Sequence, residues 1–197
     1  MTDDSASTTL TRRPLLGWGG TGLAPGPAFL VIALAVAAKL VFFAVLDRPL
    51  GCDCGRIWAM PDNPASNSLI MLDPYSLLHL VFGALLVTWL AWMRPGWGTW
   101  TLIAVVVTGS TLWELAENLP QSIQLFNYDT GDPRDYRGDS LLNAMADTAA
   151  AALGAWIAWR LLPVWAVLAL ALAVELIVSL WIGDGFVMAT LRAVQMI

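Results

Sequence analysis

Five long apolar runs constrain the fold of this chain more than any other feature of its sequence. Each contains about as many residues as the roughly 20 that a helix needs to cross a bilayer. They are Ala28–Leu46, Pro74–Met93, Trp97–Asn118, Ser140–Leu162 and Pro163–Ile182. Charged residues make up 13% of the 197-residue chain, about half the usual share of a soluble domain. We therefore expect an all-α integral membrane protein, a bundle of about five transmembrane helices with two long outer loops.

The organisation that follows from these runs is one membrane domain with two short flanking segments. Residues 1–27 are rich in Ser, Thr, Gly and Pro and are expected to form a flexible cytoplasmic tail. Residues 28–182 form the expected five-helix domain. Residues 183–197 are expected to be a short interfacial segment at the C-terminus.

Local signals mark several helix ends. Asp73 is a suitable N-cap, and Pro74 suits the first helical position. Asp139 is expected to cap the fourth helix. Pro120 ends the third helix, and the Gly-Asp-Gly run at 183–185 stops the fifth.

The distribution of arginine predicts the orientation. Arg94 and Arg160 lie in the two short connections, which contain no acidic residue, and Arg12 and Arg13 lie in the N-terminal tail. The positive-inside rule then places the tail and both short turns in the cytoplasm. We expect a bacterial inner-membrane protein whose long loops are periplasmic.

Six polar residues lie at the outer ends of the predicted helices and form the candidate catalytic site. They are His79, Glu114, Glu117, Asp139, Asn143 and Asp147. Glu114 and Glu117 are three residues apart, and Asp139, Asn143 and Asp147 follow at intervals of four, so each set shares a helix face. Gly83 and Gly154 lie on the same faces and would allow close helix contact.

An ionised side chain at mid-membrane costs at least about 2.5 kcal/mol, so these acids need a partner. Lys39 is a possible counter-charge, or it snorkels outward. A divalent metal ion is the candidate cofactor, with His79, Glu114 and Asp147 as ligands. A carboxylate beside His79 would also suit it to act as a general base. The competing interpretation is a hydrogen-bonded network that only fixes helix packing.

Two cysteines, Cys52 and Cys54, lie in the first long loop. A disulfide between them would close a small ring of the more reducible kind. Binding of a soft metal ion and a simple loop-fixing role are the other interpretations.

Four motifs occur in a fixed order: CDCG begins at Cys52, DPYSLLHLVFG at Asp73, WELAENLP at Trp113 and YRGDSLLNAMAD at Tyr136. In this order the chain resembles an uncharacterised family of bacterial multi-pass inner-membrane proteins. It is more loosely similar to VanZ-like membrane proteins. The resemblance implies a membrane bundle and favours a functional site, but it implies no particular reaction.

Three classes of function remain open at this point. The first is an enzyme that modifies a lipid or a lipid-linked envelope precursor. The second is a non-catalytic accessory subunit or scaffold of a larger membrane complex. The third is a small carrier, which the lack of an internal repeat disfavours. The expected partners are the lipid bilayer and either a lipid-linked substrate or a membrane complex, and no basic tract suggests nucleic acid.

Overall fold

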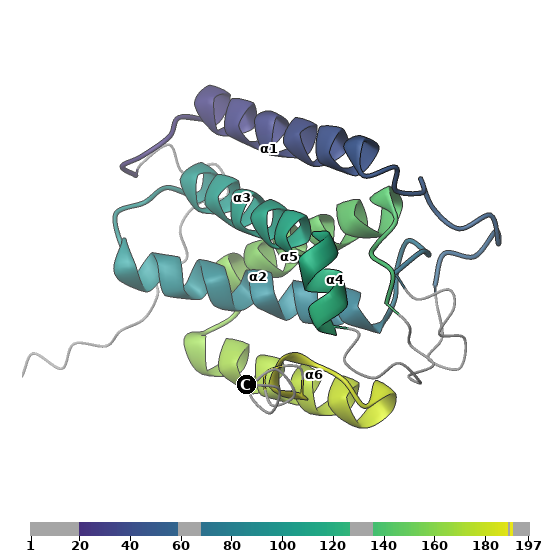
Figure 1. Cartoon of the computed structure of the whole chain (residues 1–197). Coiled ribbons are helices and arrows are strands. Elements are labelled where there is room, and N and C mark those ends of the chain that lie inside the picture. The colour runs from purple at the N-terminus through teal and green to yellow at the C-terminus, as the bar shows by residue number, and fades with distance from the viewer. Residues whose placement is uncertain (1–19, 59–67, 127–135, 189, 191–197) are drawn as a thin grey trace, which may run out of the picture.

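The computed structural model describes residues 20–58, 68–126, 136–188 and 190. Within these ranges the chain forms six α-helices (Figure 1). They are α1 Pro25–Val45, α2 Pro74–Met93, α3 Thr99–Glu117, α4 Pro120–Phe126, α5 Leu141–Leu161 and α6 Val164–Ile182. All except α4 are long and apolar enough to cross a membrane. The expected all-α bundle with five spanning helices is confirmed.

Helices α2, α3 and α5 form the inside of the bundle, and α1 and α6 cover it from opposite sides. Figure 1 shows α1 above α3, with α2 and α5 in the middle layer and α6 below. Helix α1 packs on α3, whereas α6 packs on α2. The described parts of the long connections, which follow α1 and precede α5, lie at one end of the bundle, and the short turns lie at the other.

The contact between α2 and α5 is the closest in the bundle because two glycines face the opposite backbone. A Cβ atom on Gly83 would overlap the carbonyl oxygen of Ala151. A Cβ atom on Gly154 would likewise overlap the carbonyl oxygen of Leu80. The close approach that the sequence predicted at these glycines is confirmed, and it sets the distance between two of the helices that hold the polar residues.

The interior is divided along its length into an apolar half and a polar half. The apolar half lies toward the short turns and consists of Ala84, Val87, Leu90, Leu102, Val106, Ala151, Ala155, Ala158 and Val167. The buried acids and His79 lie toward the long loops. Packing of small and branched side chains in one half thus holds the helices in register for the polar groups in the other.

Most helix ends follow their sequence signals. Asp73 caps α2, accepting hydrogen bonds from the backbone of Tyr75 and Ser76, and the Ser76 hydroxyl completes a capping box. Helix α6 ends at Gly183, whose φ of 67° is a left-handed conformation that suits glycine.

Two expectations about helix ends need correction. The N-cap of α5 is Ser140 rather than Asp139, and its hydroxyl accepts from the backbone N–H of Asn143. Asp139 is instead drawn toward Asn118. The sequence also gave no sign of α4, which begins at Pro120, the residue expected only to end the third helix.

The segments that flank the bundle are described only in part. Residues 20–24 precede α1. They bond to the turn between α2 and α3 through Thr21 and Gly96, and to the first turn of α3 through Leu23 and the Thr101 hydroxyl. Residues 1–19, most of the expected flexible tail, lie outside the described residues, as do 191–197 of the expected interfacial segment.

Candidate functional site

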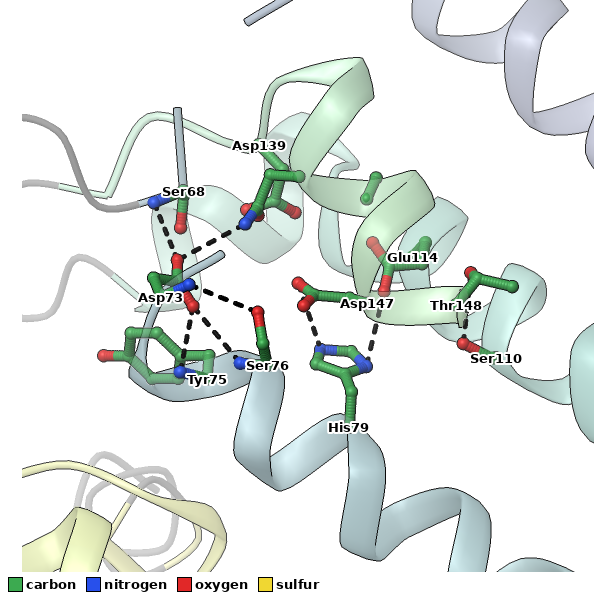
Figure 2. A network of polar contacts seen from close by, with 12 residues as sticks. Ser68, Asp73, Tyr75, Ser76, His79, Ser110, Glu114, Asp139, Asp147 and Thr148 are labelled. Carbon is green, nitrogen blue, oxygen red and sulfur yellow. Dashed lines mark hydrogen bonds and ion pairs between the residues drawn. The ribbon is translucent and has the colours of Figure 1, made fainter. Parts of the chain in front are cut away.

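His79 lies between two carboxylates from two other helices. Its Nδ1 atom is 3.4 Å from Glu114 Oε1, and its Nε2 atom is 3.7 Å from Asp147 Oδ2 (Figure 2). His79 is five residues past the start of α2, Glu114 is three before the end of α3, and Asp147 is six past the start of α5. At a rise of about 1.5 Å per residue, all three lie within about two turns of the long-loop end.

The two carboxylates are buried without the donors that buried carboxylates require. Glu114 is 1% exposed and Asp147 is 3% exposed. Neither oxygen of Glu114, nor Oδ1 of Asp147, has a hydrogen-bond partner within the described ranges. Leaving a buried polar atom unsatisfied costs about 1–3 kcal/mol, and more when the atom is charged. This group of side chains therefore calls for a cation or for protons.

His79 cannot meet that requirement alone. A neutral imidazole carries one N–H, so it donates to one carboxylate and turns a lone pair toward the other. Both distances exceed the 2.7–3.2 Å of an ordinary hydrogen bond. One ligand atom from each of His79, Glu114 and Asp147 lies within 4.8 Å of the other two, which is compact enough for a metal ion.

Lys39 supplies a positive charge from α1. It is fully buried, and its ammonium donates to the carbonyl oxygen of Ala144 and to the hydroxyl of Thr148 on α5. Ser110 on α3 donates in turn to the same hydroxyl at 3.2 Å. Of the two roles considered for Lys39, the structure shows the inward one, and the side chain does not snorkel.

A second polar layer lies beyond the helix ends, around Asp73 and Asp139. Asn118 donates to Asp139 Oδ2 at 2.5 Å and accepts from the Asp139 backbone N–H at 2.7 Å. Asn143 donates to the carbonyl oxygen of Ile70 at 3.0 Å and to Asp73 at 3.4 Å. Burial raises the pKa of the Asp73 carboxyl to about 6 and raises the pKa of Asp139 as well. This layer joins both long loops to α2, α3 and α5.

Five of the six predicted residues thus form two neighbouring groups. His79, Glu114 and Asp147 form the first. Glu117 is half-buried and lies with Asp139 beside the same Glu114, all three offering ligand atoms within 4.8 Å of one another. Asn143 belongs to neither, because its amide is engaged by Ile70 and Asp73.

Several residues of this region were not among the predicted site residues. Arg48, which follows α1, donates to the carbonyl oxygens of Arg137 and Asn118. Thr148 receives Lys39, and Tyr136 donates to Asp139 Oδ2 at 3.0 Å. Tyr136 and Asn118 lie within the sequence motifs. Arg48 has no sequence signal other than its position just after an apolar run.

The loop that follows α1 lies against the start of α5. The carbonyl oxygens of Pro49 and Leu50 accept from the backbone of Leu141 and Leu142. Beyond them Cys52 and Cys54 form a disulfide, so neither thiol is left to bind a soft metal. The first part of this loop thus reaches the site through Arg48, and its last part through Ser68 and Ile70.

The fold and this geometry define a helical integral membrane protein with a buried His–carboxylate cluster near one end of the bundle. Residues 43–197 match the family described as "Protein of unknown function (DUF2585)". The chain belongs to this family, as the resemblance in its motifs implied.

The relatives of this chain are bacterial proteins named UPF0314. One from Sphingopyxis alaskensis is 31% identical over 169 residues, which cover 85% of this chain and 89% of the relative. One from Rhizobium meliloti is 34% identical over 163 residues, or 81% of each chain. One from Novosphingobium aromaticivorans is 32% identical over 186 residues, or 89% of this chain and 86% of the relative. No solved structure matches.

Proposed function

We propose that the protein is a membrane-embedded enzyme that holds a divalent cation on His79, Glu114 and Asp147 and modifies a lipid or a lipid-linked envelope precursor. The observation that carries this proposal is His79 between two buried carboxylates, three of whose four oxygens have no hydrogen-bond partner among the described residues. A divalent cation would satisfy these oxygens and offset their charge at once.

The donor set suits a hard or borderline cation. One imidazole nitrogen with carboxylate oxygens is a common ligand combination for Zn²⁺ or Mn²⁺. A cation binds only one ring nitrogen, which leaves the other to donate its N–H to a carboxylate and so fix the orientation of the ring. Such a centre polarises a bound ester or activates a water molecule.

The position of the cluster favours a lipid-borne substrate. It lies within about two turns of the bundle end, close to the depth of the headgroups, and Glu117 beside it is half-buried rather than enclosed. Arg94 follows α2 and Arg160 lies in the last turn of α5, and both favour a cytoplasmic position for the short-turn end. Arg48, Arg56 and Arg137 lie at the long-loop end, so our placement of that end at the outer leaflet of the bacterial inner membrane is a separate part of the proposal.

Metal analysis of the protein purified in lipid nanodiscs tests the proposal. We expect bound divalent metal whose content His79→Ala lowers and Thr88→Ala leaves unchanged. Thr88 is the matched control because it lies on the same helix and its hydroxyl donates to the carbonyl oxygen of Ala84 on that helix, away from both carboxylates. The metal-loaded protein should turn over a lipid from an envelope extract, and His79→Ala should not.

Absence of both metal and turnover would contradict the enzyme proposal. Stoichiometric co-purification with another membrane protein in mild detergent would then favour the accessory-subunit alternative.

Reporter fusions test the orientation separately. Alkaline phosphatase, which is active only outside the cytoplasm, should be active when fused after Asp53 and inactive when fused after Pro95. The opposite pattern would place the cluster at the inner leaflet.

A further inference from the structure

A second group of possible metal ligands adjoins the first and shares Glu114 with it. Glu114, Glu117 and Asp139 each offer an oxygen within 4.8 Å of the others. Glu117 follows Glu114 by three residues on the same face of α3, and Asp139 comes from the loop before α5. The two groups therefore meet at one side chain.

We propose that Glu114 bridges two divalent cations, one held with His79 and Asp147 and the other with Glu117 and Asp139, and that this pair takes a phosphate ester. The inference rests on the function proposed above and adds to it a second cation and a substrate class.

The state of Glu114 is the first support. It is 1% exposed, and both of its oxygens lack a hydrogen-bond partner among the residues described. If Glu114 bound a single cation through one oxygen, its other oxygen would need a hydrogen-bond donor, because the site is buried away from water. Glu114 thus has two oxygens without a partner and belongs to both groups of ligands, which is what a bridging ligand offers.

The second observation is that hydrogen bonds from neighbouring side chains hold Asp139 in position. Asn118 and Tyr136 both donate to its Oδ2 atom, and the Asp139 backbone is tied to Asn118 as well. Hydrogen bonds of this kind orient carboxylates that bind metals. They also explain why Asp139 is held beside Glu114 instead of capping α5.

The third observation is the net charge of the cluster. Glu114, Glu117, Asp139 and Asp147 carry four negative charges when ionised, and Lys39 returns one positive charge. One divalent cation leaves the set net negative, whereas two leave it with a single positive charge. A cluster loaded with two cations therefore attracts an anion.

Arg48 indicates which anion fits. Its two terminal nitrogens donate to the carbonyl oxygens of Arg137 and Asn118, which fixes the guanidinium beside Asp139. Its Nε atom is buried and has no hydrogen-bond partner in the described ranges. A fixed guanidinium with a spare N–H next to a cation pair is suited to a phosphate group.

The reaction that such a pair supports is hydrolysis of the ester. Pairs of cations about 3.5–4 Å apart stabilise the attacking and the leaving oxygen of phosphoryl transfer. A water oxygen bonds to phosphorus, and the bond from phosphorus to the lipid oxygen breaks. The products are the lipid alcohol, which takes one proton of the water, and phosphate, which retains the other or releases it to solvent.

Manganese stoichiometry tests the second cation. The protein in nanodiscs is loaded with Mn²⁺, washed, and measured for metal content and for electron paramagnetic resonance. We expect two Mn²⁺ per chain with the spectrum of a coupled pair. Glu117→Gln and His79→Ala should each leave one uncoupled Mn²⁺, and Glu114→Gln should leave none.

The control is Glu175→Gln, which removes a carboxylate from α6 outside both groups and should keep the coupled pair. A wild-type protein with one Mn²⁺ that Glu117→Gln does not change would overturn the second cation and leave the function proposed above intact. A wild-type protein without Mn²⁺ would overturn both.

Inorganic phosphate tests the anion. Its affinity for the Mn²⁺-loaded protein, measured by titration calorimetry, should fall roughly tenfold or more in Arg48→Gln, the effect of one charge-assisted hydrogen bond. Arg56→Gln, an exposed arginine of the same loop, should bind phosphate as the wild type does. Equal affinity in Arg48→Gln would overturn the phosphate assignment.

Nanodiscs with and without phosphatidic acid separate the two sources of phosphate. Weaker binding of free phosphate in the doped discs supports a lipid phosphate ester. Unchanged binding would overturn the lipid ester as the ligand of the pair.

Discussion

Two sets of helices differ in burial and in polarity: the inner helices α2, α3 and α5, and the outer helices α1 and α6. Within the most apolar stretch of each helix, 17% of the residues of α1 and 11% of those of α6 are buried. The corresponding share in the three inner helices is 39% to 44%. The outer pair nevertheless has the higher mean hydropathy. In lipid the most apolar helices face outward, so relative polarity marks the interior, and the inner helices can hold acids because other helices enclose them.

One ionisable residue on each outer helix departs from this rule, and each has a partner. Lys39 of α1 reaches inward to Ala144 and Thr148 on α5. Glu175 of α6 accepts from the backbone N–H groups of Phe186 and Val187 just past the helix end. Lys39 thus belongs to the interior, and Glu175 to the surface.

The largest expected effect comes from separating the inner helices. Gly83→Val and Gly154→Val should each lower the free energy of unfolding by about 3 kcal/mol or more, because the added atoms overlap the opposite backbone. Gly26→Val is the control, since a Cβ atom at Gly26 on α1 meets nothing within 4 Å. Unfolding in a detergent titration measures all three, and equal stability would disprove the tight α2–α5 contact.

The next effect compares the two ionisable residues of the outer helices. Lys39→Met should cost about 3 kcal/mol in metal-free protein, because it leaves buried carboxylates without their counter-charge. Glu175→Gln should cost less than about 1.5 kcal/mol, since an amide oxygen still accepts from Val187. The same detergent titration measures both. If both substitutions have equal effects, Lys39 is not part of the interior.

The polar layer at the end of the inner helices should make the stability of the protein depend on pH. The folded pKa of Asp73, about 6, lies above its unfolded value near 3.9, so the folded state holds the proton more tightly. The free energy of unfolding should therefore fall, by at most about 3 kcal/mol, as the pH rises from about 4 to about 6.

Asp73→Asn removes this titration while keeping an N-cap residue, so it should flatten the pH profile measured by thermal unfolding. Asp139 titrates in the same direction, and Asp139→Asn should remove part of the slope as well. A profile that Asp73→Asn leaves unchanged would show that this carboxyl is not the group responsible.

The smallest effect is expected at the disulfide in the loop after α1. Replacing Cys52 and Cys54 together with serine opens a ring of three residues and should cost less than about 2 kcal/mol, because closing so short a loop removes little chain entropy. Metal content should be unchanged. A larger loss, measured by thermal unfolding, would show that the loop after α1 stabilises the interior through its disulfide.

The sequence was sufficient for the five spanning helices and for the depth of the polar residues. Length and apolarity locate a spanning helix without tertiary information, and the Asp73–Pro74 pair is a local signal for a start that the structure keeps. His79, Glu114 and Asp147 could be placed at one level because each lies near the same end of its helix.

Other features depended on contacts that no local pattern contains. Asp139 and Ser140 are equally good caps by residue type, and the bond from Asn118, 21 residues away, decides between them. Helix α4 has seven residues, too few for a periodic signal. The division of the acids around Glu114 also follows from how α3 and α5 face each other and not from spacing along either helix.

The distance along the chain between Lys39 and its acceptors has a consequence for biosynthesis. Those acceptors follow it by 105 and 109 residues. At roughly 5–20 residues per second, a ribosome needs about 5–20 s to make that stretch. Throughout this interval the ammonium of the nascent first helix has no acceptor on α5, and it must reach toward the headgroups or stay beside the insertion machinery. Docking of α1 is therefore a late step, completed only after α5 has entered the membrane.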